Sequence, residues 1–133
     1  ADRVFQDTIS LLRRDFEGNA LVRATPLHNW GLVLMELDQP MRAEAALLEA
    51  HAIREEALSS EHPLTLSTAV NLGWNYFNQN KIDDALNSAL LVRARMRNNP
   101  NIQNVSLNNN SLASDITKDA SYLTLEAAWI KNQ

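Results

Sequence analysis

The chain repeats its pattern of residues every 42 positions, and this constrains its fold more than any other feature. Gly31 and Gly73 fall in the same register, and each stands two residues after an asparagine. The same interval links the alanines at Ala1, Ala43, Ala85 and Ala127. Self-similarity at a fixed period of this size is typical of repeat architectures, in which each unit buries its apolar face against the next.

The composition favours an all-α protein with a packed core. Of the 133 residues, 45% are hydrophobic and 21% charged, and the chain has only three glycines and four prolines. This balance excludes compositional disorder. A net charge of −4 argues against nucleic acid and anionic membranes as partners, because both reward positive charge. The lack of cysteine excludes disulfides, thiolate metal sites and cysteine nucleophiles.

Apolar residues at spacings of three and four predict a series of helices joined by short breaks. The expected helices span residues 2–16, 25–37, 41–58, 64–79 and 82–97, and the stretch 111–133 is helical in composition. Gly18 suggests a C-cap for the first helix. Thr25 suggests an N-cap for the second, with Pro26 at its first position. The 42-residue register predicts a turn near residues 121–122.

The glycines and alanines indicate how two consecutive helices pack. A glycine lets two helices approach closely, because a side chain there would hold the backbones apart. On the helix that follows Gly31, Ala43 and Ala50 lie two turns apart on one face, and small residues there let the pair of helices close. Larger side chains such as Trp30 and Leu34 then fill the surrounding space.

These residues together resemble a tetratricopeptide repeat array, of the longer variety typified by kinesin light chains. The matching residues are Asn29, Trp30, Gly31 and Leu34 in one unit, and Asn71, Leu72, Gly73 and Tyr76 in the next. The segment 52–63 is similar to the inter-repeat signature of that variety. Pro40 and Asp115 depart from the family pattern, since the family favours an aromatic residue at the first and glycine at the second.

The resemblance implies an α-solenoid, in which about seven helices stack as antiparallel hairpins in a right-handed superhelix. We expect a single domain over 1–133. It divides into the second helix of a truncated repeat at 1–17, repeats at 25–58 and 64–97, and a degenerate or capping repeat at 104–133.

The register also predicts that the first helix lacks its hairpin partner, because Ala1 aligns with Ala43 inside a second helix. The apolar side chains of Phe5, Ile9 and Leu12 would then be open. We expect the next helix of the chain, or a neighbouring molecule, to cover them. The second alternative would be self-association through the N-terminal helix.

No residue pattern in the chain indicates catalysis. The three histidines, His28, His51 and His62, lie in different contexts, and none belongs to a metal-binding motif. Phosphate-binding glycine loops and nucleophile elbows are lacking. We therefore expect a protein that is not an enzyme and uses no metal and no cofactor.

In tetratricopeptide arrays the first helices of the hairpins line a concave groove that takes peptide segments, and the resemblance implies such a groove here. Helical spacing places an apolar stripe on that side, with asparagines beside it. The predicted groove residues are His28, Asn29, Leu32 and Met35 in one unit, and Val70, Asn71, Trp74, Phe77 and Asn78 in the next. A carboxamide can donate to and accept from a peptide unit at once. The alternative for Asn29 and Asn71 is that they cap or bridge helices.

We therefore expect a non-enzymatic scaffold, one module of a larger protein, that binds a protein or peptide rather than nucleic acid or a membrane. The alternative is a regulatory or sensor domain attached to a kinase or a DNA-binding domain, with a peptide or small molecule in the groove. The first two hairpins carry no matched pair of basic residues in the groove, which argues against a strict clamp on a C-terminal carboxylate. The compartment stays open, with the cytoplasm slightly favoured.

Overall fold

The computed structural model describes residues 2–15, 18–99 and 111–133, with the backbone alone for 111–114. The elements are α1 (Asp2–Asp15), a 3-10 helix η1 (Ala20–Arg23), α2 (Ala24–Glu36), α3 (Pro40–Leu58), α4 (Pro63–Asn78), α5 (Ile82–Arg97) and α7 (Ser111–Lys131). All regular secondary structure in these ranges is helical. The predicted all-α repeat fold is confirmed.

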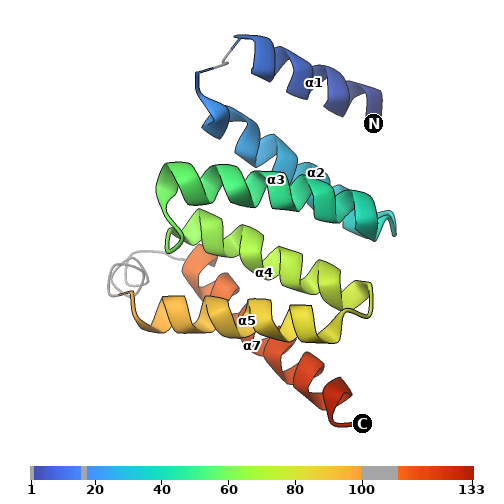
Figure 1. Cartoon of the computed structure of the whole chain (residues 1–133), viewed down its shortest axis with the longest axis vertical. Coiled ribbons are helices and arrows are strands. Elements are labelled where there is room, and N and C mark those ends of the chain that lie inside the picture. Colours follow the sequence, from blue (N-terminus) through green and yellow to red (C-terminus); the bar gives the residue numbers. More distant parts are fainter. Residues whose placement is uncertain (1, 16–17, 100–110) are drawn as a thin grey trace.

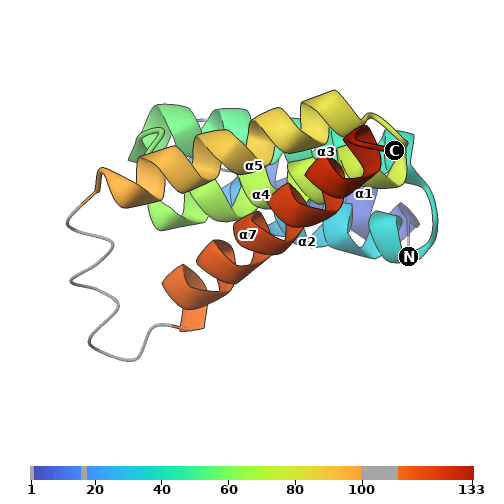
Figure 2. The ribbon, with the colours of Figure 1, turned by 90° about the horizontal axis from the view of Figure 1, so that it is seen from below.

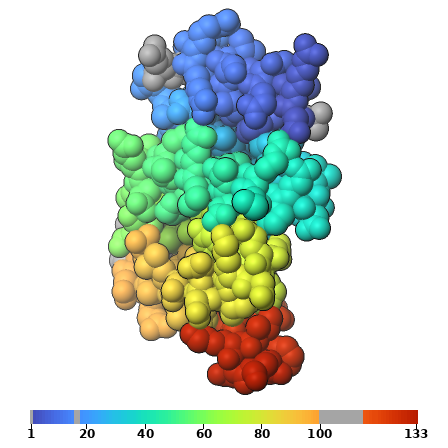
Figure 3. Space-filling view, turned by 45° about the vertical axis from the view of Figure 1, so that its right-hand side comes forward, coloured from blue at the N-terminus to red at the C-terminus, as the bar shows by residue number. Residues whose placement is uncertain are grey.

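Consecutive helices run antiparallel and stack along the long axis of the molecule, with α1 at one end and α7 at the other (Figure 1). The helices α2, α4 and α7 lie on one side of this stack, and α3 and α5 lie on the other (Figure 2). The space-filling view follows the same order from one end to the other (Figure 3). We call α2, α4 and α7 the first helices, and α1, α3 and α5 the second helices.

The 42-residue repeat is visible in the backbone of the turns within the hairpins. Asp38 and Asn80, one repeat apart, both adopt the left-handed conformation, with φ of 56° and 62°. Aspartate and asparagine tolerate this region better than most residues. In the first turn the amide of Gln39 donates to the carbonyl of Leu34 at 2.9 Å, and the equivalent bond of the second turn is also 2.9 Å. The same turn therefore closes both hairpins.

The two glycines in register are sites of close approach between helices. A Cβ at Gly31 would lie 2.6 Å from Cγ of Leu47 on α3. A Cβ at Gly73 would lie 3.1 Å from Cβ of Ser88 on α5, and 2.6 Å from Cδ2 of Leu123 on α7. The role expected for the glycines is thus seen, and Gly73 also accommodates the following first helix.

The buried apolar residues form several clusters along the stack instead of one central core. One cluster joins α4, α5 and α7 and consists of Leu66, Val70, Val92, Met96, Ile116 and Ala120. Others lie between α2 and α3, and between α1 and α2. Ile9 is buried in the last of these, and the ring of Phe5 also stacks on Trp30 of the α2–α3 cluster, with centroids 4.6 Å apart. The apolar face of the N-terminal helix is therefore covered by the chain itself, the first of the two expected alternatives.

Three local predictions are wrong. Gly18 does not have positive φ, so it is not a left-handed C-cap. Helix α2 begins at Ala24 directly after η1, and the hydroxyl of Thr25 accepts from Arg54 at 3.2 Å instead of capping the helix. The turn near residues 121–122 is absent because α7 is one continuous helix through them, and neither residue favours a turn.

Candidate binding surface

The open side of the first helices carries three pairs of equivalent polar residues. On α2 the side chains of Thr25, Asn29 and Glu36 are exposed, and they share one face of the helix. Their equivalents on α4 are Ser67, Asn71 and Asn78, of which Asn78 is exposed and the other two are half-buried. We call these six residues the polar face. It contains the three asparagines that were predicted to line a groove, Asn29, Asn71 and Asn78.

Two of the predicted groove residues are buried between neighbouring first helices, and the prediction is wrong for them. Val70 is 1% exposed and packs in the cluster that contains Ile116 and Ala120 of α7. His28 is 8% exposed, with Nδ1 3.0 Å from the hydroxyl of Thr68 on α4. Both positions face the next repeat, so neither side chain is available to a partner.

The remaining apolar groove residues are half-buried, and three of them pack against other helices. Met35 packs against the cluster of Trp30 and Leu34. Trp74 and Phe77 make an edge-to-face pair with centroids 5.7 Å apart, and both pack against the cluster that includes Leu123 of α7. Leu32 is half-buried beside the polar face. Most side chains of the predicted apolar stripe thus pack against neighbouring helices of the same chain.

A buried arginine that no sequence pattern indicated joins three helices beneath the polar face. Arg54, on α3, is 4% exposed. Its Nη1 donates to the hydroxyl of Thr68 at 2.8 Å and to the carbonyl of Leu64 at 3.2 Å, while Nη2 donates to Thr25. Because these oxygens are all neutral, the guanidinium is held by hydrogen bonds, with no carboxylate among the described residues as a partner. Burial lowers its pKa.

The contacts of His28 suit a neutral imidazole. Nδ1 lies 3.2 Å from Nη1 of Arg54 and 3.0 Å from the hydroxyl of Thr68. Because a guanidinium can only donate, the tautomer with its hydrogen on Nε2 suits this neighbour, and the two hydrogens of Nη1 are shared among Thr68, Leu64 and Nδ1. The amide of Asn71 lies 3.4 Å from Nε2; since the two ends of an amide are interchangeable by a flip, its oxygen can accept that hydrogen. Burial, and secondarily the charge of Arg54, lowers the pKa of His28 from 6.5 to about 4.

Two helix pairs, α2–α3 and α4–α5, repeat along the axis of the molecule and are joined by a polar network. The profile of the tetratricopeptide repeat family matches residues 22–98, more than half of the 133-residue chain. The chain belongs to the tetratricopeptide repeat family. No curated protein matches it. Tetratricopeptide repeats are generally protein–protein interaction modules, and this match spans both helix pairs and the Arg54 network.

A fourth asparagine of this tetratricopeptide repeat protein, Asn75, bridges two helices. Asn75 on α4 is fully buried, and its Nδ2 donates to the carbonyl of Pro40, at the start of α3, at 2.8 Å. Its Oδ1 has no hydrogen-bond partner among the described residues. Asn29, by contrast, is exposed. The bridging alternative, raised for Asn29 and Asn71, thus describes Asn75, and it also fits Asn71 through its contact with His28; it leaves Asn29 free for a partner.

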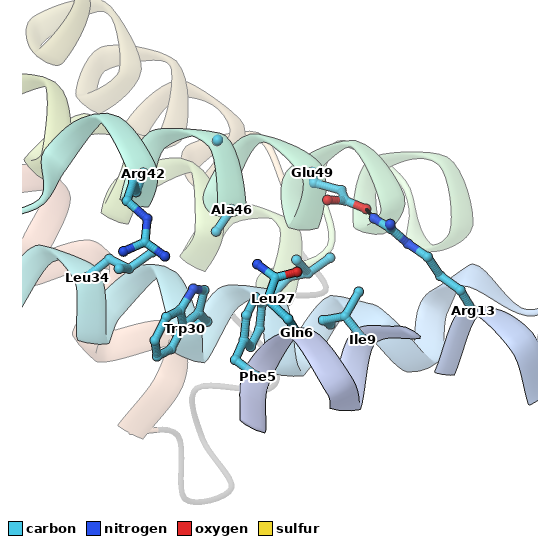
Figure 4. A pocket seen from close by; sticks show the side chains of 11 residues that line it. Phe5, Gln6, Ile9, Arg13, Leu27, Trp30, Leu34, Arg42, Ala46 and Glu49 are labelled. Atoms are coloured by element: carbon cyan, nitrogen blue, oxygen red, sulfur yellow. Dashed lines mark hydrogen bonds and ion pairs between the residues drawn. The ribbon is translucent and has the colours of Figure 1, made fainter. Parts of the chain in front are cut away.

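A cavity of about 240 Å³ lies where α1 packs against α2 and α3 (Figure 4). Apolar side chains such as Phe5, Ile9 and Trp30 line it, and an ion pair between Arg13 and Glu49, 2.9 Å apart, lies at its rim. Both members of this pair are well exposed, so it contributes little to stability.

Within the described ranges, no group of three or more histidine, aspartate or glutamate side chains is arranged to hold a metal ion. None of the described helices is both long and apolar enough to cross a membrane.

Proposed function

We propose that this protein binds an extended peptide segment of a partner protein across the polar face, with Asn29 and Asn71 holding the peptide backbone. The observation that carries the proposal is the exposure of Asn29 together with the half-exposed Asn71 at the equivalent position of the next repeat. A carboxamide matches the donor and the acceptor of a peptide unit. Asn71 is half-buried, and its contact with His28 orients its amide.

The spacing of the helices sets the register of such a peptide. Packed helices lie about 8–10 Å apart, and an extended chain advances about 3.3 Å per residue. Two carboxamides on neighbouring first helices would therefore engage peptide units about three residues apart. The flanking Leu32 and Trp74, both half-buried, leave limited apolar surface, so the proposal assigns recognition chiefly to main-chain hydrogen bonds.

The 42-residue spacing of equivalent residues and the segment 52–63 support placing the array in the longer variety typified by kinesin light chains. In the structure this segment forms the end of α3 and the turn into α4. There His62 caps α4 by accepting from the amide of Leu64 at 3.1 Å.

Replacing Asn29 with alanine is expected to weaken peptide binding by about 1–3 kcal/mol, the cost of leaving a desolvated polar partner unpaired. Its exposure predicts a nearly unchanged melting temperature. The peptide would be selected from a displayed library of random extended sequences, and its affinity measured by calorimetry. Asn87→Ala is the matched control, because Asn87 is an exposed asparagine on the second helix α5.

The variant Asn71→Ala separates the two roles of an asparagine at this position. A loss of affinity comparable to that of Asn29→Ala supports a shared hold on the peptide. If both substitutions instead lower the melting temperature and leave affinity intact, the two residues bridge helices and the proposal is overturned. Equal losses in Asn29→Ala and Asn87→Ala would likewise overturn it.

A further inference from the structure

The solvent-facing side of α3 is apolar over most of its length. Its exposed residues follow one another at spacings of four, three and four, which places them on one face of the helix; they are Met41, Ala45, Leu48 and Ala52. The side chains of Met41 and Leu48 are 77% and 45% exposed. The opposite face is the packed one, since Ala43 and Leu47 are fully buried. A surface helix normally turns a polar face to water, so this second apolar face indicates an interaction surface.

Helix α5 continues this apolar face one repeat later. Leu90 and Ala94 are the equivalents of Leu48 and Ala52. Leu90 is 46% exposed, and Leu91 beside it is 48% exposed. Helices α3 and α5 lie on the same side of the stack (Figure 2), and they run in the same direction because consecutive helices are antiparallel (Figure 1). Both lie between α1 and α7 along the axis, so the face belongs to neither end of the stack. We call it the second-helix face.

The charges that flank this face have opposite signs on its two helices. Near the start of the helix, Arg42 on α3 has Asp84 as its equivalent on α5. Near the end, Glu55 has Arg97 as its equivalent. All four residues are exposed. Arg42 pairs with Asp2 of α1 at 2.6 Å, but a guanidinium has five N–H donors and can bind a second carboxylate. The second-helix face is therefore complementary in charge to a copy of itself in which α3 and α5 have changed places.

We propose that the second-helix face binds the same face of a second copy of the chain, in a dimer whose two-fold axis runs parallel to α3 and α5. This rotation places α3 of each copy on α5 of the other, with both helices running in the same direction. In a parallel pair that meets along alternating spacings of three and four, residues of the same register lie opposite each other. Leu48 then packs on Leu90, and Glu55 meets Arg97. Each contact occurs twice, because the interface is isologous.

The contact uses the second helices and leaves the polar face of the first helices open to a peptide, so it is independent of the proposed function. An isologous contact occupies the same surface on both copies, and association therefore stops at two. The weight-average mass of the wild-type chain, measured by sedimentation equilibrium, is expected to rise with concentration from one chain to two and then to level off. A monomer at every concentration up to the solubility limit, or growth beyond two copies, would overturn the proposal.

A single substitution tests whether this face is the one that associates. Leu48→Glu should raise the dissociation constant of the dimer about tenfold or more, because it places a carboxylate in the apolar contact at both equivalent sites. Leu48 is exposed in the single chain, so circular dichroism should show unchanged helix content. The matched control is Leu125→Glu on α7, where the leucine is 68% exposed and lies outside the contact. If the control disrupts the dimer and Leu48→Glu does not, another surface associates and the proposal is overturned.

An exchange of charges distinguishes the proposed arrangement from one in which α3 meets α3 and α5 meets α5. Glu55→Arg or Arg97→Glu alone brings like charges together and should weaken the dimer about tenfold at low salt. The double variant restores opposite charges between positions 55 and 97, so it should regain the dissociation constant of the wild type. In the other arrangement the helices are antiparallel, and position 55 meets Arg42 while position 97 meets Asp84. The double variant would then be the weakest of the three, and the proposed arrangement would be wrong.

Discussion

Replacing Gly31 with leucine is expected to lower the free energy of unfolding by about 3 kcal/mol, the upper end of the usual cost of overpacking a core. Even a Cβ at this position would lie 2.6 Å from Cγ and 2.8 Å from Cδ2 of Leu47. Leu47 is fully buried, so it cannot turn away into solvent. The two helices of the first hairpin would have to move apart. Urea denaturation followed by circular dichroism measures the change.

The chain supplies its own control for this substitution. A Cβ at Gly18 would meet nothing within 4 Å, so Gly18→Leu should change stability by no more than a typical surface substitution, about 0.5 kcal/mol. Gly73→Leu should resemble Gly31→Leu, because it would displace Leu123 and press on Ser88. Equal stabilities for the Gly18 and Gly31 variants would show that close approach at Gly31 does not limit the hairpin.

The repeat predicts the fold well because residues in the same register pack in the same way in both units. Gly31 and Gly73 indicate where helices approach, and the breaks at Asp38 and Asn80 have the same backbone conformation in the structure. The error at Thr25 has a different origin. Its side chain is suited to an N-cap, but the hydroxyl binds Arg54, a residue 29 positions away. A local preference was overridden by a contact between helices.

The candidate site was harder to predict, because periodicity shows which residues share a helix face and does not show which neighbour that face meets. Asn29 and His28 are adjacent, yet one is exposed and the other buried. Which of them faces the next repeat depends on how consecutive first helices are offset, and that is a tertiary property. Arg54 was missed because it precedes Glu55 and Glu56 in a stretch that has the composition of a solvated helix surface.

Lowering the pH from 7 to 4 is expected to remove about 3 kcal/mol of stability through His28 alone. The pKa of its imidazole is lowered from 6.5 to about 4 in the folded protein, chiefly by burial and then by Arg54. Between these values the unfolded chain binds a proton at His28 that the folded chain does not. The stability that depends on neutral His28 is therefore fully present above pH 6.5, and it is lost as the pH falls toward 4.

His51 acts in the same direction, since burial lowers its pKa as well, so the contribution of His28 must be isolated by substitution. His28→Gln keeps a side chain that can accept from Arg54 and removes the titration. The free energy of unfolding is measured by urea denaturation at each pH from 7 to 4. Between these limits it should fall by about 3 kcal/mol less in this variant than in the wild type, whatever the stability of the variant at pH 7. His51→Gln controls for the second histidine. If His28→Gln and the wild type lose stability in parallel over this range, His28 is not the buried neutral base that its contacts indicate.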